Sequence, residues 1–146
     1  MFFGMTRALF DSYIFGDTRF YYLSLIRESD YASEAWSIHG LWPQYSTSSY
    51  PSFCKKVDFS LDALRSIMTE LQEHWYSNTG DNPDFWKHEY TKHGSCMFKD
   101  MTELEYFTLA LNLFNRAITL GLPEKYYNSS TGKCLIPENL DFTFKN

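Results

Sequence analysis

Two kinds of hydrophobic pattern occur in this chain, and their order along the sequence constrains the fold more than any other feature. An unbroken aromatic and aliphatic run, FYYLSLI, covers residues 20–26 and is typical of a buried β-strand. Over residues 60–75 and 102–120, apolar residues recur every three or four positions, as in amphipathic helices. A strand region followed by helices favours a sheet with helices packed on it. A length of 146 residues corresponds to one domain of this kind. We therefore predict the α+β class and a single domain over residues 1–146.

Local signals predict where these elements begin and end. Residues 36–38 are expected to form a short second strand. Ser60 is expected to cap the first helix. Thr102, with Glu105 three residues later, forms a capping box before the last helix. Three segments rich in Ser, Gly, Asn or Pro are expected to be loops: residues 44–53, 77–84 and 121–133.

Charge and hydropathy exclude several classes of protein. The chain carries 18 acidic and 13 basic residues and has no basic block, which disfavours tight binding to duplex nucleic acid. Its apolar stretches are interrupted by residues such as Asp11 and Arg27, and none approaches the roughly 20 residues that span a bilayer. Asp11 also falls where a signal peptide has its apolar segment, so the N-terminus is a poor signal sequence. A membrane-spanning protein is not expected.

Histidines gather in two segments of unusual composition. His39 lies in SIHGLWP, residues 37–43, and two further histidines lie in FWKHEYTKHGSC, residues 85–96. If the second segment is helical, its ionisable groups share a sector about 140° wide. Trp86 and Tyr90 adjoin this sector, which favours a pocket wall over a solvated helix face. The sector contains His88, Glu89, Lys92 and His93.

Such a set is suited to cleaving an RNA phosphodiester. One imidazole can take the proton of a ribose 2′-hydroxyl while another protonates the departing 5′-oxygen, near neutral or acid pH. A lysine and a third imidazole can stabilise the negative charge that develops on phosphorus. A zinc site is the alternative interpretation. Against it, the five-residue spacing of His88 and His93 turns their side chains apart on a helix, and Lys92 would repel a dication. His74, beside Trp75, is expected to be an ordinary partly buried residue.

Residues 39–43 (HGLWP) and 88–96 (HEYTKHGSC) resemble the two active-site segments of the ribonuclease T2 family. The two segments occur in the family's order, and a softer similarity extends over residues 20–123. The resemblance implies an antiparallel sheet packed against several helices. It also implies an endoribonuclease that cleaves single-stranded RNA by transesterification through a 2′,3′-cyclic phosphate. No metal and no cofactor are implied.

The resemblance also implies roles for the catalytic residues. His39 corresponds to the general acid toward the leaving 5′-oxygen, and His93 to the general base on the 2′-hydroxyl. Glu89 and Lys92 correspond to the pair that stabilises the transition state, and Glu89 would also orient His93.

Further residues would bind substrate. His88 corresponds to a phosphate-binding position. Trp42 and Tyr50 would stack on the primary base, and Phe85 would flank the second base site. Gln44 stands where many members carry aspartate, and an amide can both donate and accept, so low base specificity is expected.

The three cysteines lie in no CxxC pair. The counterparts of Cys54 and Cys96 in the family are paired, which implies a disulfide between them and leaves Cys134 outside it. A secreted, vacuolar or lysosomal location follows from the same resemblance, and the alternative is three reduced thiols in a cytosolic protein.

Departures from the family pattern motivate a second hypothesis. A cysteine-rich insertion before the first segment is missing, residues 25–28 replace a frequent Gln-Trp-Pro, and few residues follow Cys134. The alternative is a catalytically impaired relative that binds RNA or acts in signalling. The intact histidines, with Glu89 and Lys92, argue for the enzyme, because an idle site has no chemical need for them.

Overall fold

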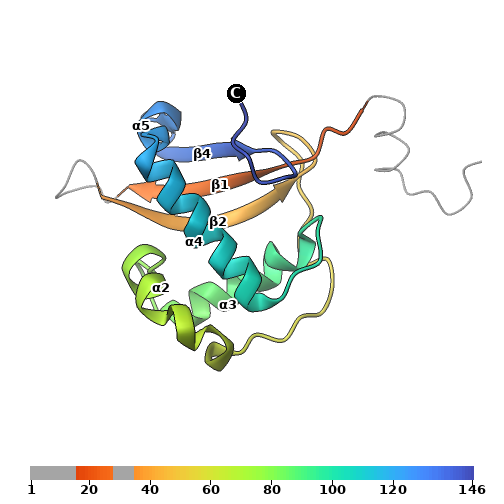
Figure 1. Cartoon of the computed structure of the whole chain (residues 1–146), viewed down its shortest axis with the longest axis vertical. Helices are drawn as coiled ribbons and strands as arrows, with labels where there is room; N and C mark the ends of the chain where they lie inside the picture. The colour runs from red at the N-terminus through yellow and green to blue at the C-terminus, as the bar shows by residue number, and fades with distance from the viewer. Residues whose placement is uncertain (1–15, 28–34) are drawn as a thin grey trace, which may run out of the picture.

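The computed structural model describes residues 16–27 and 35–146 of the chain, so the N-terminal run that contains Asp11 lies outside it. Four strands form an antiparallel sheet in the order β2-β1-β4-β3, and helices pack on it (Figure 1). This confirms the predicted α+β class. The strands are β1 (Phe20–Arg27), β2 (Trp36–Gln44), β3 (Tyr127–Asn128) and β4 (Lys133–Glu138). The helices are α2 (Met68–His74), α3 (Asn82–Lys92), α4 (Glu103–Thr119) and α5 (Leu122–Tyr126), with 3₁₀ segments η1 (Leu61–Ile67) and η2 (Gly94–Cys96).

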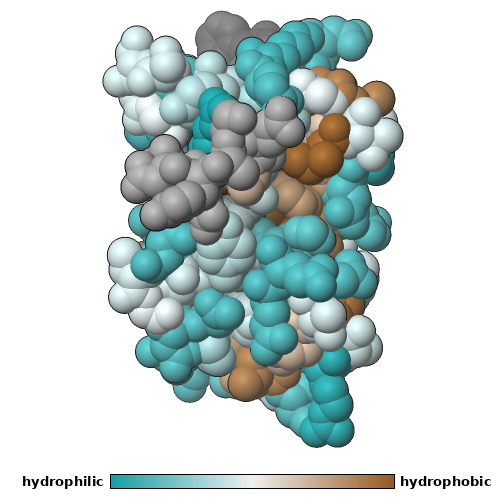
Figure 2. All heavy atoms as spheres, turned by 90° about the vertical axis from the view of Figure 1, so that its left-hand side faces the viewer, coloured by the Kyte–Doolittle hydropathy of each residue, from teal (hydrophilic) through white to brown (hydrophobic). Residues whose placement is uncertain are grey.

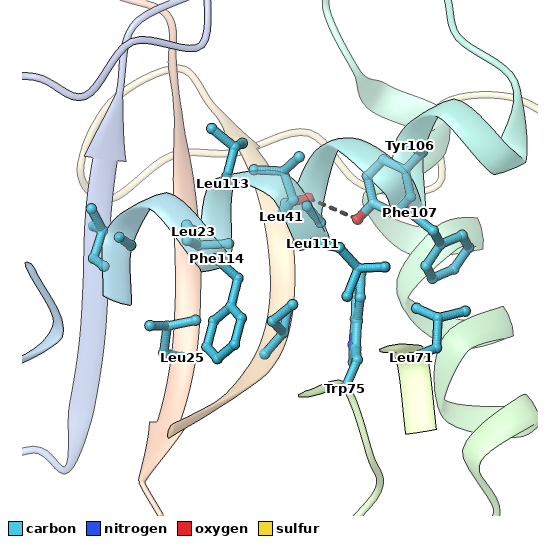
Figure 3. Packing of buried hydrophobic residues seen from close by; sticks show 14 of the residues in the cluster. Leu23, Leu25, Leu41, Leu71, Trp75, Tyr106, Phe107, Leu111, Leu113 and Phe114 are labelled. Atoms are coloured by element: carbon cyan, nitrogen blue, oxygen red, sulfur yellow. Dashed lines mark hydrogen bonds between the residues drawn. The ribbon is translucent and has the colours of Figure 1, made fainter. Parts of the chain in front are cut away.

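The hydrophobic core lies between α4 and one face of the sheet (Figure 3). Alternate residues of β1 point to this face, and Leu23 and Leu25 are buried there, as the period of two in a strand requires. From α4, the predicted stripe contributes Phe107, Leu111 and Phe114. One polar group ties the layers together (Figure 3): the Tyr106 hydroxyl donates to the Leu41 carbonyl at 2.9 Å.

Several predicted boundaries need correction. The second strand continues past residue 38 to Gln44, so the whole first histidine segment is strand. Ser60 forms no side-chain cap; its N–H instead donates to the Glu103 carboxylate at 2.8 Å, and the first helical turns are 3₁₀. Residues 121–133, expected to be a loop, contain α5, β3 and the start of β4. The capping box of Thr102 and Glu105 is confirmed at the start of α4.

The predicted disulfide is confirmed. Cys54 and Cys96 are joined with an S–S distance of 2.07 Å, and Cys134 is a free, buried cysteine. The bond ties the segment after β2 to the turn that follows α3. A second link lies beside it, because the Phe53 N–H donates to the Lys92 carbonyl at 2.9 Å.

The surface near α5 is mostly hydrophilic, with small hydrophobic areas (Figure 2). Ile118 and Leu120, at the end of α4, are among the exposed large hydrophobic residues. Within residues 16–27 and 35–146, no helix is long and apolar enough to cross a membrane.

Candidate active site

A cavity of about 370 Å³ brings the two histidine segments together. Strand β2, helix α3 and the loop after β2 form most of its wall, and β1 and β4 complete it. Eight of the residues singled out in the sequence line it: His39, Trp42, Gln44, Tyr50, His88, Glu89, Lys92 and His93. Phe85 does not line the cavity, although its ring centroid lies 5.9 Å from that of His39.

A β-bulge presents His39 to this cavity. Along the β1–β2 ladder, Ser24 pairs with Gly40 and Leu25 pairs with Ile38, so His39 is the extra residue of β2. A bulge breaks the strict alternation of faces and redirects the side chain at that point. A hydrogen bond fixes the backbone at this point: the Trp75 indole donates to the His39 carbonyl at 3.0 Å.

Helix α3 supplies the second histidine segment. Its buried side carries Trp86 and Tyr90, and its last turn carries Glu89 and Lys92. The ionisable sector of α3 lines the cavity, and the adjoining Trp86 and Tyr90 are buried in the core beneath the site. The two aromatic rings therefore fix the helix, while its polar residues face the cavity.

The indole of Trp42 contacts both histidines. Its ring centroid is 5.0 Å from His39, edge-on, and 5.0 Å from His93, stacked at 26°. Its Nε1 donates to Glu89 Oε1 at 2.9 Å. The expectation that Glu89 orients His93 is therefore not met: the carboxylate bonds the indole, and the buried His93 Nδ1 has no hydrogen-bond partner among the described residues. Stacking on Trp42 positions the His93 ring instead.

Burial sets the protonation of these groups. It is the main cause that lowers the pKa of His93 from the usual 6.5 to about 3, and the positive charges of Lys92 and His39 add to it. Burial, then the charges of His88 and Lys92, also lowers the pKa of His39. For Glu89, burial raises the pKa to about 7, against the opposing effects of the Trp42 bond and Lys92. In mildly acid solution His93 is thus neutral and Glu89 carries a proton.

Gly40 is a site residue that the sequence analysis did not single out. A Cβ at this position would lie 2.3 Å from both Glu89 Oε1 and Trp42 Nε1, the two atoms of their hydrogen bond. A glycine inside a strand often marks such a close approach, and that signal was present in the sequence.

Gly40→Ala is expected to lower kcat/KM for RNA about ten- to a hundredfold, because the added methyl group displaces the Trp42–Glu89 pair and with it His93. Gly80→Ala is the matched control, since a Cβ there has only Ser77 Oγ nearby, at 3.9 Å. Steady-state kinetics of both variants test this. Equal activity of the two variants would show that the close contact is unimportant.

The remaining predicted site residues differ in exposure. Tyr50 is half exposed, its ring centroid is 6.2 Å from His93, and the Lys92 ammonium lies 5.9 Å from the Tyr50 ring centroid. Gln44 is buried, and its Nε2 donates to the Ser46 carbonyl at 2.9 Å, which leaves one N–H and the amide oxygen for other partners. His88 is more exposed and lies 4.0 Å from the Glu89 carboxylate. His74 packs on Phe114, outside the cavity.

Other lining residues carry no motif in the sequence: Tyr22, Thr47, Ser48, Lys133 and Leu135. Those from β4 were missed because the sequence analysis predicted no strand over residues 133–138. In the part of the chain that the structure describes, no cluster of three His, Cys, Asp or Glu residues is arranged to hold a metal ion.

Relatives and solved structures point to one family. Ribonuclease DdI of Dictyostelium discoideum is 43% identical over 83 residues, covering 56% of this chain and 37% of that protein. Ribonuclease 1 of Arabidopsis thaliana is 33% identical over 112 residues, covering 74% of this chain and 49% of that protein. The chain thus spans about half, or less, of the length of these curated relatives. Ribonuclease MC1 from bitter gourd seeds has the same fold, with a TM-score of 0.59 at 24% identity over 73% of this chain and 62% of that chain.

RNase NT, solved in complex with 5′-AMP, gives a TM-score of 0.64 at 18% identity, covering 86% of this chain and 87% of that chain. The family model for ribonuclease T2 matches residues 18–132, which include both histidine segments, the bulged strand and helix α3. The chain therefore belongs to the ribonuclease T2 family.

Proposed function

We propose that this chain is a single-domain endoribonuclease that cleaves single-stranded RNA by transesterification, without a metal ion. The observation that carries the proposal is the shared cavity: His39 from β2 and His93 from the end of α3 line the same space, and Glu89 and Lys92 line it as well. Family membership supports the ribonuclease activity, and the chemistry of the cavity supports the mechanism.

In the first step His93 acts as the base. Its low pKa keeps it neutral, so it can accept the proton of the ribose 2′-hydroxyl. The 2′-oxygen then forms a bond to phosphorus while the bond from phosphorus to the 5′-oxygen breaks. Protonated His39 gives its proton to that leaving oxygen. The products are a 2′,3′-cyclic phosphate and a free 5′-hydroxyl.

In the second step the two histidines exchange roles. His39, now neutral, takes a proton from water, the hydroxyl attacks phosphorus, and the bond to the 2′-oxygen breaks. His93, now protonated, returns its proton to the 2′-oxygen. The product is a 3′-phosphate, and both histidines regain their starting states.

Charge on the phosphorane is stabilised by neighbouring groups. The Lys92 ammonium provides positive charge at the cavity wall. Glu89 is suited to donate a hydrogen bond, because burial raises its pKa to about 7 and keeps it protonated in acid. His88 is placed to contact a non-bridging phosphate oxygen. Trp42 and Tyr50 are proposed to hold the primary base, and Phe85 to lie near the second base.

The pH profile of kcat/KM is expected to be a bell on the acid side of neutrality. His93 must be neutral, so the acid limb falls near its pKa of about 3. His39 must be protonated, and its pKa is lowered from 6.5, so activity is lost as pH rises through a value below 6.5. Initial rates at low substrate concentration measure this profile, which reports the free enzyme. An alkaline limb above the usual imidazole range would contradict the assignment.

Gln44→Asp is expected to change the ratio of poly(A) to poly(U) cleavage by about two- to tenfold, the worth of one hydrogen bond to a base edge. The wild-type amide retains a donor and an acceptor, so it accommodates several bases, while an ionised carboxylate only accepts. Ser46→Ala is a control, because Gln44 bonds the Ser46 backbone rather than its side chain. An unchanged ratio in Gln44→Asp would show that this residue does not read the base.

An oxidising compartment, secretory or vacuolar, is also proposed as the place of action. The Cys54–Cys96 disulfide supports it, because such bonds persist mainly outside the reducing cytosol.

Cleavage of homopolymer RNA in the presence of EDTA at mildly acid pH tests the proposed activity. The enzyme is expected to cut under these conditions. RNA binding without cleavage would instead support the impaired, RNA-binding alternative. Cleavage only after adding a divalent cation would contradict the metal-independent mechanism.

A further inference from the structure

The cavity extends beyond the histidines onto the outer face of the sheet. Along β1 and β4 the core-facing residues alternate with outward residues, and Tyr22, Leu135 and Lys133 are among the outward ones. All three line the same cavity as His39 and His93. The floor of the cavity is therefore made by strands that carry none of the proposed catalytic groups.

Strand geometry separates this floor from the catalytic groups. Gly40 of β2 and Leu135 of β4 both pair with Ser24 of the central strand β1, so they lie opposite each other across it. Two inter-strand spacings place their Cα atoms about 10 Å apart, and Lys133 lies two residues further along β4. A phosphate held between β2 and α3 is thus in reach of Lys92. The ammonium of Lys133 instead faces another phosphate position along a bound RNA chain.

The charge of this floor suits an anion. Lys133 is exposed, and among the described residues its ammonium forms no ion pair with a carboxylate. Glu89 is the one carboxylate among the cavity-lining residues that the structure describes, and its raised pKa reduces its negative charge. A chain with a formal net charge of −5 thus presents a locally positive cavity, which concentrates polyanions at the site.

We propose that Lys133 binds an RNA phosphate that flanks the cleaved one, so that the outer face of the sheet is a subsite for RNA beyond the scissile dinucleotide. Leu135, two residues along β4 from Lys133, and Tyr22, which pairs with Trp42 of β2, provide the nonpolar surface over which the intervening nucleotide lies. This inference rests on the proposed function and extends it to longer substrates.

Dinucleotides that differ by one phosphate test the subsite. The substrates are a dinucleoside monophosphate and the same compound with an added 5′- or 3′-terminal phosphate. In the wild-type protein one of the added phosphates is expected to raise kcat/KM about three- to tenfold, as one lysine–phosphate contact allows. The ratio of kcat/KM with the added phosphate to kcat/KM without it is expected to fall close to one in Lys133→Met. Lys133→Arg is expected to retain the wild-type ratio.

Lys125→Met is the matched control. Lys125 also carries an exposed ammonium, but it lies on α5, whose Pro123 carbonyl contacts Cys134 on the core side of the sheet. The control is expected to keep the wild-type ratio. A Lys133→Met ratio equal to that of wild type, or a wild-type ratio of one for both phosphates, would overturn the proposal.

Binding of a 2′-O-methyl tetranucleotide, measured by fluorescence anisotropy, keeps the test independent of cleavage. Loss of one phosphate contact is expected to reduce the slope of log Kd against log salt concentration by about 0.7 in Lys133→Met. If the wild type binds but cleaves none of the dinucleotides, the proposed activity fails while the slope still decides the role of Lys133. If cleavage occurs and neither ratio nor slope depends on Lys133, the subsite fails alone.

Discussion

Replacing His39 or His93 with alanine is expected to lower kcat for RNA cleavage by about 10²–10⁴-fold. Each substitution removes one of the two groups that move protons in the transition state, which is the range such groups contribute. Folding is expected to survive, because both side chains face the cavity and the core is built from other residues. Single-turnover rates with saturating enzyme measure the effect on chemistry separately from substrate binding.

His74→Ala is the matched control for these substitutions. His74 is partly buried and packs against Phe114, outside the cavity, so its loss is expected to leave kcat near the wild-type value. The double variant of His39 and His93 is expected to lose about as much as the worse single variant, since the two groups act as a unit. A His93→Ala protein that cuts at the wild-type rate would remove the central assignment.

Removal of the disulfide is expected to lower the free energy of unfolding by about 3–4 kcal/mol. Cys54 and Cys96 are separated by 42 residues, and the chain-entropy model gives this value for a loop of that size. The double substitution of both cysteines by serine, compared with wild type in urea titrations, measures it. Activity is also expected to fall, because Tyr50 lies on the segment that the bond holds against α3.

Cys134→Ala provides the control for the disulfide. This buried thiol forms no disulfide, so its replacement changes only local packing between β4 and α5. In denatured, non-reduced protein a thiol titration is expected to find one reactive group per chain, at Cys134. Three reactive thiols, or a loss of stability in Cys134→Ala equal to that of the double serine variant, would contradict the pairing.

The sequence predicted the fold class because its strongest hydrophobic patterns are local. Most of the run at residues 20–26 is buried, as are Phe107, Leu111 and Phe114 of α4, whereas Ile118, expected on the same face of α4, is exposed. Strand β4 was harder to predict. It is an inner strand between β1 and β3, but the polar and apolar residues of its sequence, KCLIPE, do not alternate, and it contains Pro137.

The composition of the site could be predicted, but its internal contacts could not. The resemblance implied that Glu89 orients His93, which lies four residues further along the chain. In the structure the Glu89 carboxylate instead accepts a hydrogen bond from the indole of Trp42, 47 residues away in sequence. Such a tertiary partner has no local signal. The bulge at His39 and the narrow space at Gly40 likewise depend on how β2 pairs with β1 and packs on α3.

The central claim is that the ribose 2′-hydroxyl is the nucleophile, that His93 accepts its proton and that His39 protonates the leaving 5′-oxygen. A DNA oligonucleotide with one ribonucleotide, incubated with the protein and EDTA at mildly acid pH, tests it most directly. The account predicts a single cut after the ribonucleotide, with a 2′,3′-cyclic phosphate on one fragment and a 5′-hydroxyl on the other, visible by mass spectrometry. Cleavage at deoxyribose positions, or fragments that carry 5′-phosphates, would contradict it.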